Sequence, residues 1–248
     1  MFDTWRWATG NNLSPSVVLD KRDGKVKMLL YIFLPMIIVG LAQWKVRKAF
    51  KKYSQVPAER RMSGAQVAQS LLSENGIHDV EVEEVEGDLS DHYDPKDRKV
   101  RLSTQNYRSG SLAGLAIAAH EVGHAIQDAK GYFPLHIRTQ VLPVASLGDK
   151  LGFPLIIAGM LFNVSGLLNW GILFFAAAVL FQVITLPVEF NASSRAMELL
   201  ARGGYLLPEE VPGARKVLNA AAMTYVAATA ASLMTLLHYV LLARGGDD

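Results

Sequence analysis

The sequence contains no cysteine, no low-complexity tract and no marked excess of one charge. The absence of cysteine excludes disulfides, thiolate metal ligands and a cysteine nucleophile, although it leaves the redox compartment undetermined. A net charge of +2 over 248 residues does not indicate nucleic-acid binding, and no nucleic-acid partner is expected. The chain is nevertheless rich in apolar residues, which make up 50% of it, and its mean hydropathy is +0.19. This composition is typical of a small membrane protein that also has one soluble lobe.

Long apolar segments predict about four transmembrane helices. The first, residues 28–44, would cover about 25 Å at 1.5 Å per residue, which is the short end for a bilayer core. Two apolar runs, 151–168 and 170–188, predict a transmembrane hairpin, with Gly166, Asn169 and Gly171 suited to its tight turn. The expected organisation is therefore a polar tail (1–27), helix 1 (28–44), a soluble lobe (45–150), the hairpin (151–188), a polar helix and loop (189–219), helix 4 (220–243) and a short tail (244–248).

Basic residues near the first apolar segment indicate its orientation. A dense cluster follows the segment, whereas the basic residues before it are mixed with Asp20 and Asp23. Cytoplasmic flanks carry an excess of lysine and arginine, so we expect a multi-pass protein of the cell membrane with the lobe in the cytoplasm. The cluster after the segment comprises Lys45, Arg47, Lys48, Lys51 and Lys52.

Residues 54–150 are expected to form an α+β lobe. Ser63 is a candidate cap for a helix over SGAQVAQSLLSEN, and the alternating segment 79–86 predicts a strand. A turn-rich stretch, 91–97, leads to a second predicted strand, 99–103. We expect these two strands to form a hairpin whose edge pairs with an extended substrate. The predicted fold class is thus a mostly helical α+β membrane protein with a small β-hairpin or sheet in its lobe.

The stretch SLAGLAIAAHEVGHAIQDAK, residues 111–130, predicts one helix that carries His120-Glu121-Val122-Gly123-His124. Two histidines four apart lie on one helix face, about 6 Å apart at Cβ, and can reach a single Zn²⁺. Glu121 would then act as a base on a zinc-bound water. The alternative is a pair of surface histidines beside a solvated glutamate, but the apolar surroundings make these groups costly without a partner.

A catalytic zinc site needs a third protein ligand, and without cysteine it must be histidine, aspartate or glutamate. Glu189 is the best candidate because it follows an apolar run and opens a helical segment, EFNASSRAMELLARGG. The transmembrane hairpin would return the chain to the side of His120 and His124, which places Glu189 on the correct side. The alternative for Glu189 is a capping carboxylate at the membrane interface. Rival ligands are His92, Asp128 and His136.

Several further residues are candidates for supporting roles. Asp128, four residues after His124, either orients an imidazole or is a plain surface charge. The oxyanion of a tetrahedral intermediate could be stabilised by one of four side chains, although for each of them a surface turn or hydrogen-bonded packing is the simpler reading. These four are His92, Tyr93, Tyr107 and Arg195.

The motif HEVGHAIQ, preceded by SDHYDPKDRKVRLS and followed by EFNASSRA, resembles the YugP-like family of membrane-bound neutral zinc metallopeptidases. The likeness runs from about Ser63 to Arg202. It implies a membrane-embedded zincin with His120 and His124 as ligands and Glu121 as general base. The more distantly similar HtpX and CAAX prenyl protease type implies Glu189 as third ligand. That type has an aspartate four residues later, where this chain has Ser193, with Asn191 nearby as another possible supporting residue.

The sequence therefore predicts an integral membrane, zinc-dependent endopeptidase of the HExxH type, acting on protein or peptide substrates that include membrane proteins. Two alternatives remain open at this point. One is a membrane scaffold or binding protein with a structural zinc, and the other is a zinc amidohydrolase acting on a non-peptide substrate.

Overall fold

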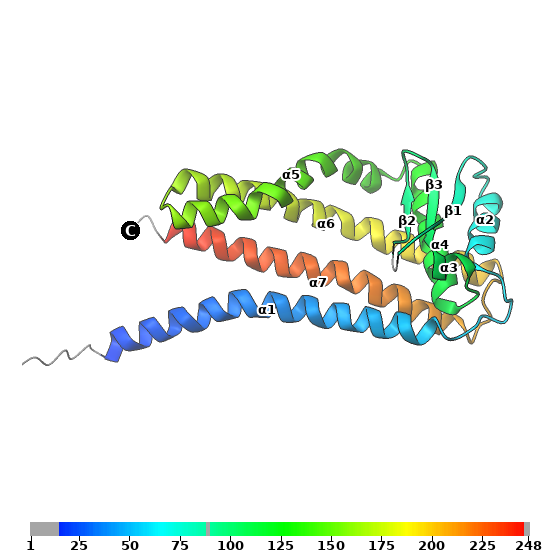
Figure 1. Cartoon of the computed structure of the whole chain (residues 1–248), viewed down its shortest axis with the longest axis horizontal. Coiled ribbons are helices and arrows are strands. Elements are labelled where there is room, and N and C mark those ends of the chain that lie inside the picture. The colour runs from blue at the N-terminus through cyan, green and yellow to red at the C-terminus, as the bar shows by residue number, and fades with distance from the viewer. Residues whose placement is uncertain (1–14, 88–89, 246–248) are drawn as a thin grey trace, which may run out of the picture.

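The computed structural model describes residues 15–87 and 90–245, with side chains described for Tyr31 and from Phe33 onward. The expected tails lie largely outside these residues, except that residues 15–27 belong to the first helix. Four long helices run side by side, and a small lobe sits at one end of them (Figure 1). The bundle helices are α1 (Pro15–Tyr53), α5 (Phe133–Leu161), α6 (Ser165–Arg202) and α7 (Val211–Arg244). The lobe contains α2 (Gly64–Glu74), β1 (Glu81–Val85), β2 (His92–Asp94), β3 (Lys99–Ser103), α3 (Thr104–Arg108) and α4 (Leu112–Ala129). The predicted fold class, a mostly helical α+β membrane protein, is confirmed.

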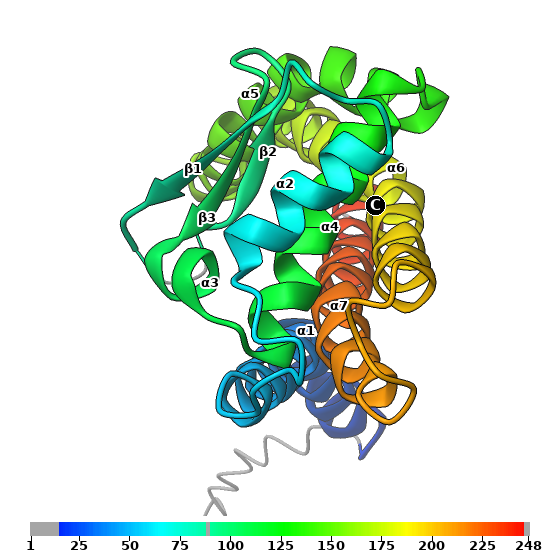
Figure 2. The same ribbon diagram turned by 90° about the vertical axis from the view of Figure 1, so that its right-hand side faces the viewer.

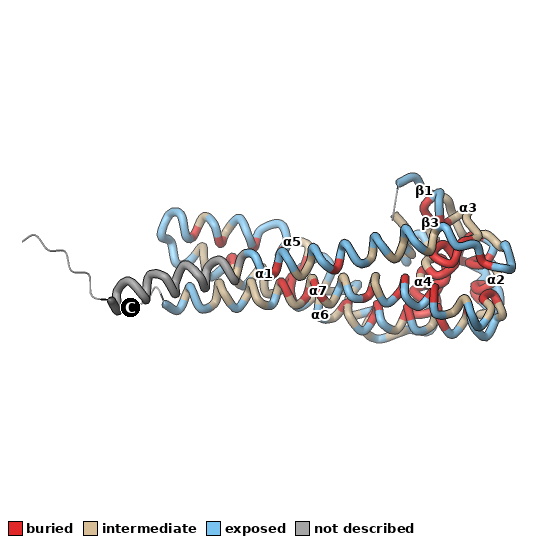
Figure 3. The backbone as a smooth tube through the Cα atoms, turned by 90° about the horizontal axis from the view of Figure 1, so that it is seen from below, coloured by how far each residue is buried: buried red, intermediate tan, exposed pale blue. Residues whose placement is uncertain are grey.

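Three helices of the described part, α5, α6 and α7, are long and apolar enough to cross a membrane. Large apolar side chains cover the outside of this bundle, whereas buried residues concentrate towards the lobe (Figure 3). The expected first span, residues 28–44, lies in α1 and is not among the three, so the predicted number of four is not reached. Part of that segment, residues 28–30 and 32, lies outside the residues whose side chains are described.

The turn between α5 and α6 lies earlier than predicted. It is formed by residues 162–164, where Asn163 has a φ of 54°, and not by the glycines near residue 169. Of the two, Gly171 serves close helix packing, since a Cβ there would come within 2.6 Å of the Ile156 nitrogen, whereas a Cβ at Gly166 would meet nothing within 4 Å. Small residues of this kind let membrane helices approach each other closely.

The helix α6 is also longer than predicted. It continues through Pro187 and ends only at Arg202, so Glu189 lies in its interior and does not open a new helix. The argument from a helix N-terminus was therefore wrong for Glu189. Likewise, α5 begins at Phe133, and the segment before residue 151 is part of the same helix as the expected span.

The lobe sheet has the order β1-β3-β2, with β1 parallel to β3 and β2 antiparallel to β3 (Figure 2). Both predicted strands exist, but the expected hairpin between them is wrong because parallel strands cannot be joined by a tight turn. The hairpin is instead made by β3 and by His92–Asp94, a stretch predicted as a turn. As a result, β2 is an edge strand.

The helix α4 occupies the centre of the lobe, where it packs against α2, β3 and α6. The predicted cap is present, since the Ser111 hydroxyl accepts a hydrogen bond from the Gly114 nitrogen at 3.1 Å. Ser63 likewise forms a capping box at the start of α2. Leu115, Val122 and Ile126 are fully buried on α4. Because this apolar face is held by neighbours on several sides, the histidine motif on the same helix has a fixed position.

Candidate metal centre

His120, His124 and Glu189 converge at the point where α4 meets α6. Their ligand atoms all lie within 4.8 Å of one another, and this set could hold a metal ion. The two imidazole Nε2 atoms are 3.2 Å apart, and the Glu189 Oε2 lies 3.3 Å from that of His120 and 3.7 Å from that of His124. Ligands about 2.0–2.2 Å from a tetrahedral zinc ion are about 3.3–3.6 Å from one another. The donor atoms and their spacing therefore fit Zn²⁺.

Gly123, inside the histidine motif, allows Glu189 to come this close. A Cβ at Gly123 would lie 2.8 Å from the Ala192 carbonyl oxygen and 3.2 Å from its Cα, on the facing turn of α6. Only a residue without a side chain permits this approach. Ala192 is three residues after Glu189, so the close contact and the ligand belong to the same turn of α6. Sequence reasoning missed this role of the glycine.

Gln127 orients His124. The Gln127 Nε2 donates to the Val188 carbonyl oxygen at 2.8 Å and to the Asn191 Oδ1 at 3.0 Å, which turns its Oε1 towards the His124 Nδ1 at 3.0 Å. The His124 Nδ1–H donates to that oxygen, so its Nε2 presents a lone pair to the ligand group. Gln127 is completely buried and lies three residues after His124 on the same helix. That spacing was a signal in the sequence, but the residue considered for this orienting role was Asp128, with a plain surface charge as the alternative.

His120 has a comparable partner on α6. The Ser193 hydroxyl lies 3.2 Å from the His120 Nδ1, where it can accept the ring N–H and leave Nε2 free. Ser193 thus stands beside the ligand at the position where the HtpX type implies an aspartate. Asn191 makes no hydrogen bond to either histidine among those described. It accepts hydrogen bonds from Gln127 and Arg195, so it acts on His124 only through Gln127.

The group is buried, and its carboxylate lies beside basic side chains. Glu189 is only 2% exposed, so an unpaired carboxylate there would be costly. Burial disfavours the charged form of His124, but the carboxylates of Glu189 and Glu121 outweigh it and raise the pKa of His124. The Arg138 guanidinium of α5 also lies 3.7 Å from the Glu189 Oε1. The Glu189 carboxylate is therefore buried beside a guanidinium and two imidazoles, a setting in which a metal ion would also be stabilised.

Two cavities meet at this group. The strand cavity, of about 430 Å³, lies between β2, α5 and the ligands, and the interface cavity, of about 300 Å³, lies between α1, α4, α6 and α7. Glu121 is 7% exposed and lines both cavities. Tyr225 of α7, which sequence reasoning missed, does the same. The residues shared by the two walls are Asp91, His120, Glu121, Glu189 and Tyr225.

Asp128 and Tyr93 form a separate pair beside the site. The Tyr93 hydroxyl donates to the Asp128 Oδ2 at 2.8 Å, and Arg98 lies 3.9 Å from the same carboxylate. Burial, and then the hydrogen bond to Asp128, raise the pKa of Tyr93, so the hydroxyl stays protonated. Asp128 is thus engaged with β2 and not with an imidazole. Tyr93 and His92 both line the strand cavity.

The remaining candidates lie elsewhere. Arg195 donates to the Asn191 Oδ1 at 2.7 Å and lines another cavity, beside Glu74. Tyr107 packs against the hydrophobic core of the lobe. His136 lies near Gly131, after α4. Among the described residues, none of these three lines either cavity at the ligand group.

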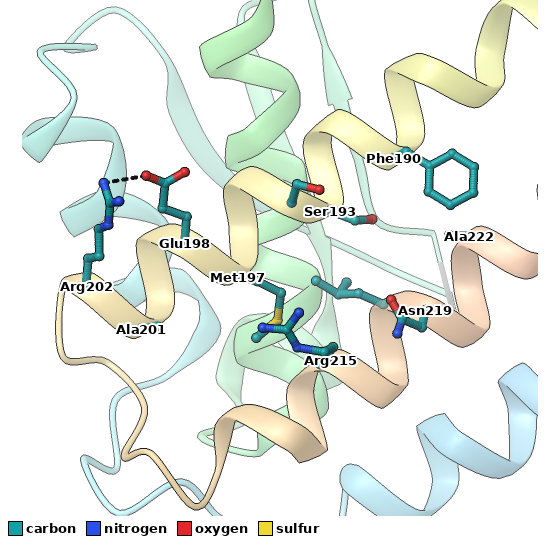
Figure 4. A pocket seen from close by; sticks show the side chains of 11 residues that line it. Phe190, Ser193, Met197, Glu198, Ala201, Arg202, Arg215, Asn219 and Ala222 are labelled. Carbon is teal, nitrogen blue, oxygen red and sulfur yellow. Dashed lines mark ion pairs between the residues drawn. The ribbon is translucent and has the colours of Figure 1, made fainter.

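A further pocket, of about 360 Å³, lies between α6 and α7 on the other side of Ser193 (Figure 4). Its rim carries the ion pair between Arg202 and Glu198, and Arg215 points across it from α7. Because His120, His124 and Glu189 are not part of its wall, this pocket is a neighbour of the metal centre and not an extension of it.

Helices able to cross a membrane and a buried His/His/Glu group together define a membrane metalloprotein. Residues 28–244 match the family described as "Putative neutral zinc metallopeptidase", and the chain belongs to this family. It is similar to a protein of Bacillus subtilis (strain 168) named "Putative membrane protease YugP", with 45% identity over 223 residues, or 89% of this chain and 99% of that protein. No solved structure matches the chain. The family implies Zn²⁺ as the metal, as predicted.

Proposed function

We propose that the protein is an integral membrane endopeptidase in which His120, His124 and Glu189 hold Zn²⁺ and Glu121 is the general base. One observation carries the proposal: the three ligand atoms converge at the junction of two cavities, and Glu121 lines both. A substrate chain that passes from one cavity to the other would cross the metal centre with Glu121 beside it. The family membership and the similarity to a membrane protease support the same reading.

Each side chain of the site has a separate role in the proposed mechanism. Bound Zn²⁺ supplies Lewis-acid polarisation and lowers the pKa of a water molecule. Glu121 takes a proton from the attacking water as its oxygen bonds to the peptide carbonyl carbon, and it then gives this proton to the amine nitrogen as the C–N bond breaks. Gln127 and Ser193 keep the imidazoles oriented throughout. Tyr225, Tyr93, His92 and Arg138 line the cavities from which an oxyanion could be stabilised.

We also propose that the site faces the cytoplasm. The lobe lies at the end of the bundle that holds the basic residues of α1, and the C-terminal end of α7 lies at the opposite end (Figure 1). Trp44 is 57% exposed on α1, and the Lys48 ammonium lies 4.7 Å above its ring. An aromatic residue followed by basic residues is typical of a membrane interface on the cytoplasmic side.

The test compares three variants purified in detergent, with bound zinc and the hydrolysis of casein and a quenched peptide as readouts. Glu121→Gln should retain about one zinc per chain and lose activity by a factor of at least 100, because the base is gone. Glu189→Ala should lose the zinc. Glu198→Gln is the matched control on α6, since its carboxylate pairs with Arg202 at the other pocket, and it should change neither readout.

The outcomes separate the candidate functions. Unchanged hydrolysis in Glu121→Gln would refute the mechanism. Stoichiometric zinc without any hydrolysis of peptides by the unaltered protein would favour a scaffold with a structural zinc or an amidohydrolase with a non-peptide substrate. Retention of zinc by Glu189→Ala would show that another group is the third ligand.

A further inference from the structure

The two cavities at the metal centre differ in the charge of their walls. Beyond the shared residues, the strand cavity is lined by three charged side chains, Asp94, Lys96 and Arg138. The described wall of the interface cavity has none, and its polar groups are confined to Gln43, Ser193 and Thr224. The apolar part of this wall consists of Val46, Phe50, Val217, Leu218, Ala221 and Ala222, together with Ile117.

The α1 and α7 residues of its wall show where the interface cavity lies along the bundle. Its α1 wall, residues 43–50, spans the end of the apolar run and the start of the basic cluster, and Trp44 with Lys48 marks this level. Its α7 wall begins at Val217, in the second turn of that helix, and includes Tyr225. The interface cavity therefore lies at the level of Trp44 and Lys48, the pair that we assign to the membrane interface. The strand cavity is bordered by the lobe through residues 91–96 and by the bundle through Leu135, Leu142 and Phe181.

These observations restrict what can occupy each cavity. A charged side chain that enters the interface cavity would lose its hydration against an apolar wall, whose charged groups are confined to the residues shared with the strand cavity, and this is unfavourable. An aliphatic or aromatic side chain would gain from burial there. Charged side chains are accommodated in the strand cavity, where Lys96 and Arg138 face a partly polar space and β2 offers a free strand edge.

We propose that the substrates are polypeptides cut at the boundary between an apolar and a polar segment. Aliphatic or aromatic residues on one side of the scissile bond occupy the interface cavity, and polar or charged residues on the other side occupy the strand cavity. Such a boundary occurs where a membrane-inserted segment leaves the bilayer. The inference rests on the proposed endopeptidase function and adds its substrate class.

The experiment maps cleavage of a randomised peptide library by mass spectrometry, using the full chain in detergent. The unaltered protein should enrich large apolar residues and exclude charged ones on one side of the cut only. Ala221→Phe, which fills the interface cavity, should reduce this enrichment about tenfold, the usual scale for changes in an apolar specificity pocket. Ala220→Phe is the matched control, because it adds the same ring at the neighbouring position outside the cavity wall. The control should keep the original profile.

A second variant is included so that the proposal can still be tested if the Ala221→Phe protein does not fold. Val46→Trp fills the same cavity from α1, and bound zinc in either variant shows that the metal centre is intact. Equal apolar enrichment on both sides of the cut would overturn the proposal. An unchanged profile in the filled variants would also overturn it, as expected if a lipid chain occupies the cavity. If the unaltered protein shows no peptide cleavage that is lost in the Glu121→Gln variant, the proposed function itself is refuted.

Discussion

The substitution Gly123→Ala tests whether the contact between α4 and α6 sets the metal geometry. The added Cβ would lie 2.8 Å from the Ala192 carbonyl oxygen, whereas ordinary contacts begin at 3.4 Å. The helices would have to separate by about 0.6 Å, because backbone atoms on both sides leave no flexible side chain to yield. Glu189 lies on the same turn of α6 and would move away from the histidines by a similar amount.

The expected loss of zinc affinity follows from how small a displacement of its ligands a zinc site tolerates. Ligand distances in a zinc site are held within about 0.2 Å, so a displacement of ~0.6 Å in one of three ligands exceeds this range. We expect a loss of zinc affinity of about 10- to 100-fold, the range seen when the surroundings of a metal ligand are disturbed. Overpacking should also destabilise the fold by about 1–3 kcal/mol.

The assay is competitive zinc titration against a chelating dye, with thermal unfolding of the apoprotein measured in parallel. Gly152→Ala is the matched control, since its Cβ would lie 2.9 Å from the Phe175 nitrogen at another close helix contact. This control should be destabilised to a similar degree while its zinc affinity stays unchanged. Zinc affinity and peptide hydrolysis at the original level in Gly123→Ala would refute the reasoning.

Three other predictions concern the surroundings of the site. Gln127→Leu should lower zinc affinity about 10- to 100-fold, because His124 loses the acceptor that fixes its tautomer, and an equal affinity by titration would contradict this role. Tyr93→Phe should lower the free energy of unfolding by about 1.5–3 kcal/mol through loss of the hydrogen bond to Asp128, as measured with denaturant, without a change in bound zinc. In the cysteine-free chain, Lys130→Cys should resist an impermeant maleimide in intact cells, whereas Asn163→Cys should react; the reverse pattern would place the site outside.

The helix that carries the histidine motif was predictable because every signal that defines it is local in the sequence. Ser111 caps the start, the apolar positions repeat with helical spacing, and two histidines four apart must share a face. The strands at residues 81–85 and 99–103 were predictable for the same reason. Their pairing was not, because whether two strands run parallel depends on what lies between them, and three residues of a predicted turn form the intervening strand.

The helical turns in the bundle were misplaced because glycine has two uses that look alike in a sequence. Gly166 and Gly171 were interpreted as turn residues, yet Gly171 provides a close contact with α5 and the chain reverses at Asn163. The same ambiguity hid the role of Gly123. A close approach between helices is a property of both partners, and nothing in the sequence near Gly123 identifies Ala192 as the other partner.

Glu189 was nevertheless identified as a candidate ligand, although one reason for choosing it was wrong. The helix-terminus argument fails because α6 is continuous, but the topological argument does not depend on where helices start or turn. Any pair of antiparallel crossings between His124 and Glu189 returns the chain to the same side of the membrane. The turn at residues 162–164 and the long helices α5 and α6 still make such a pair. A candidate based on the number of crossings therefore tolerates errors in every boundary, whereas one based on a single helix end does not.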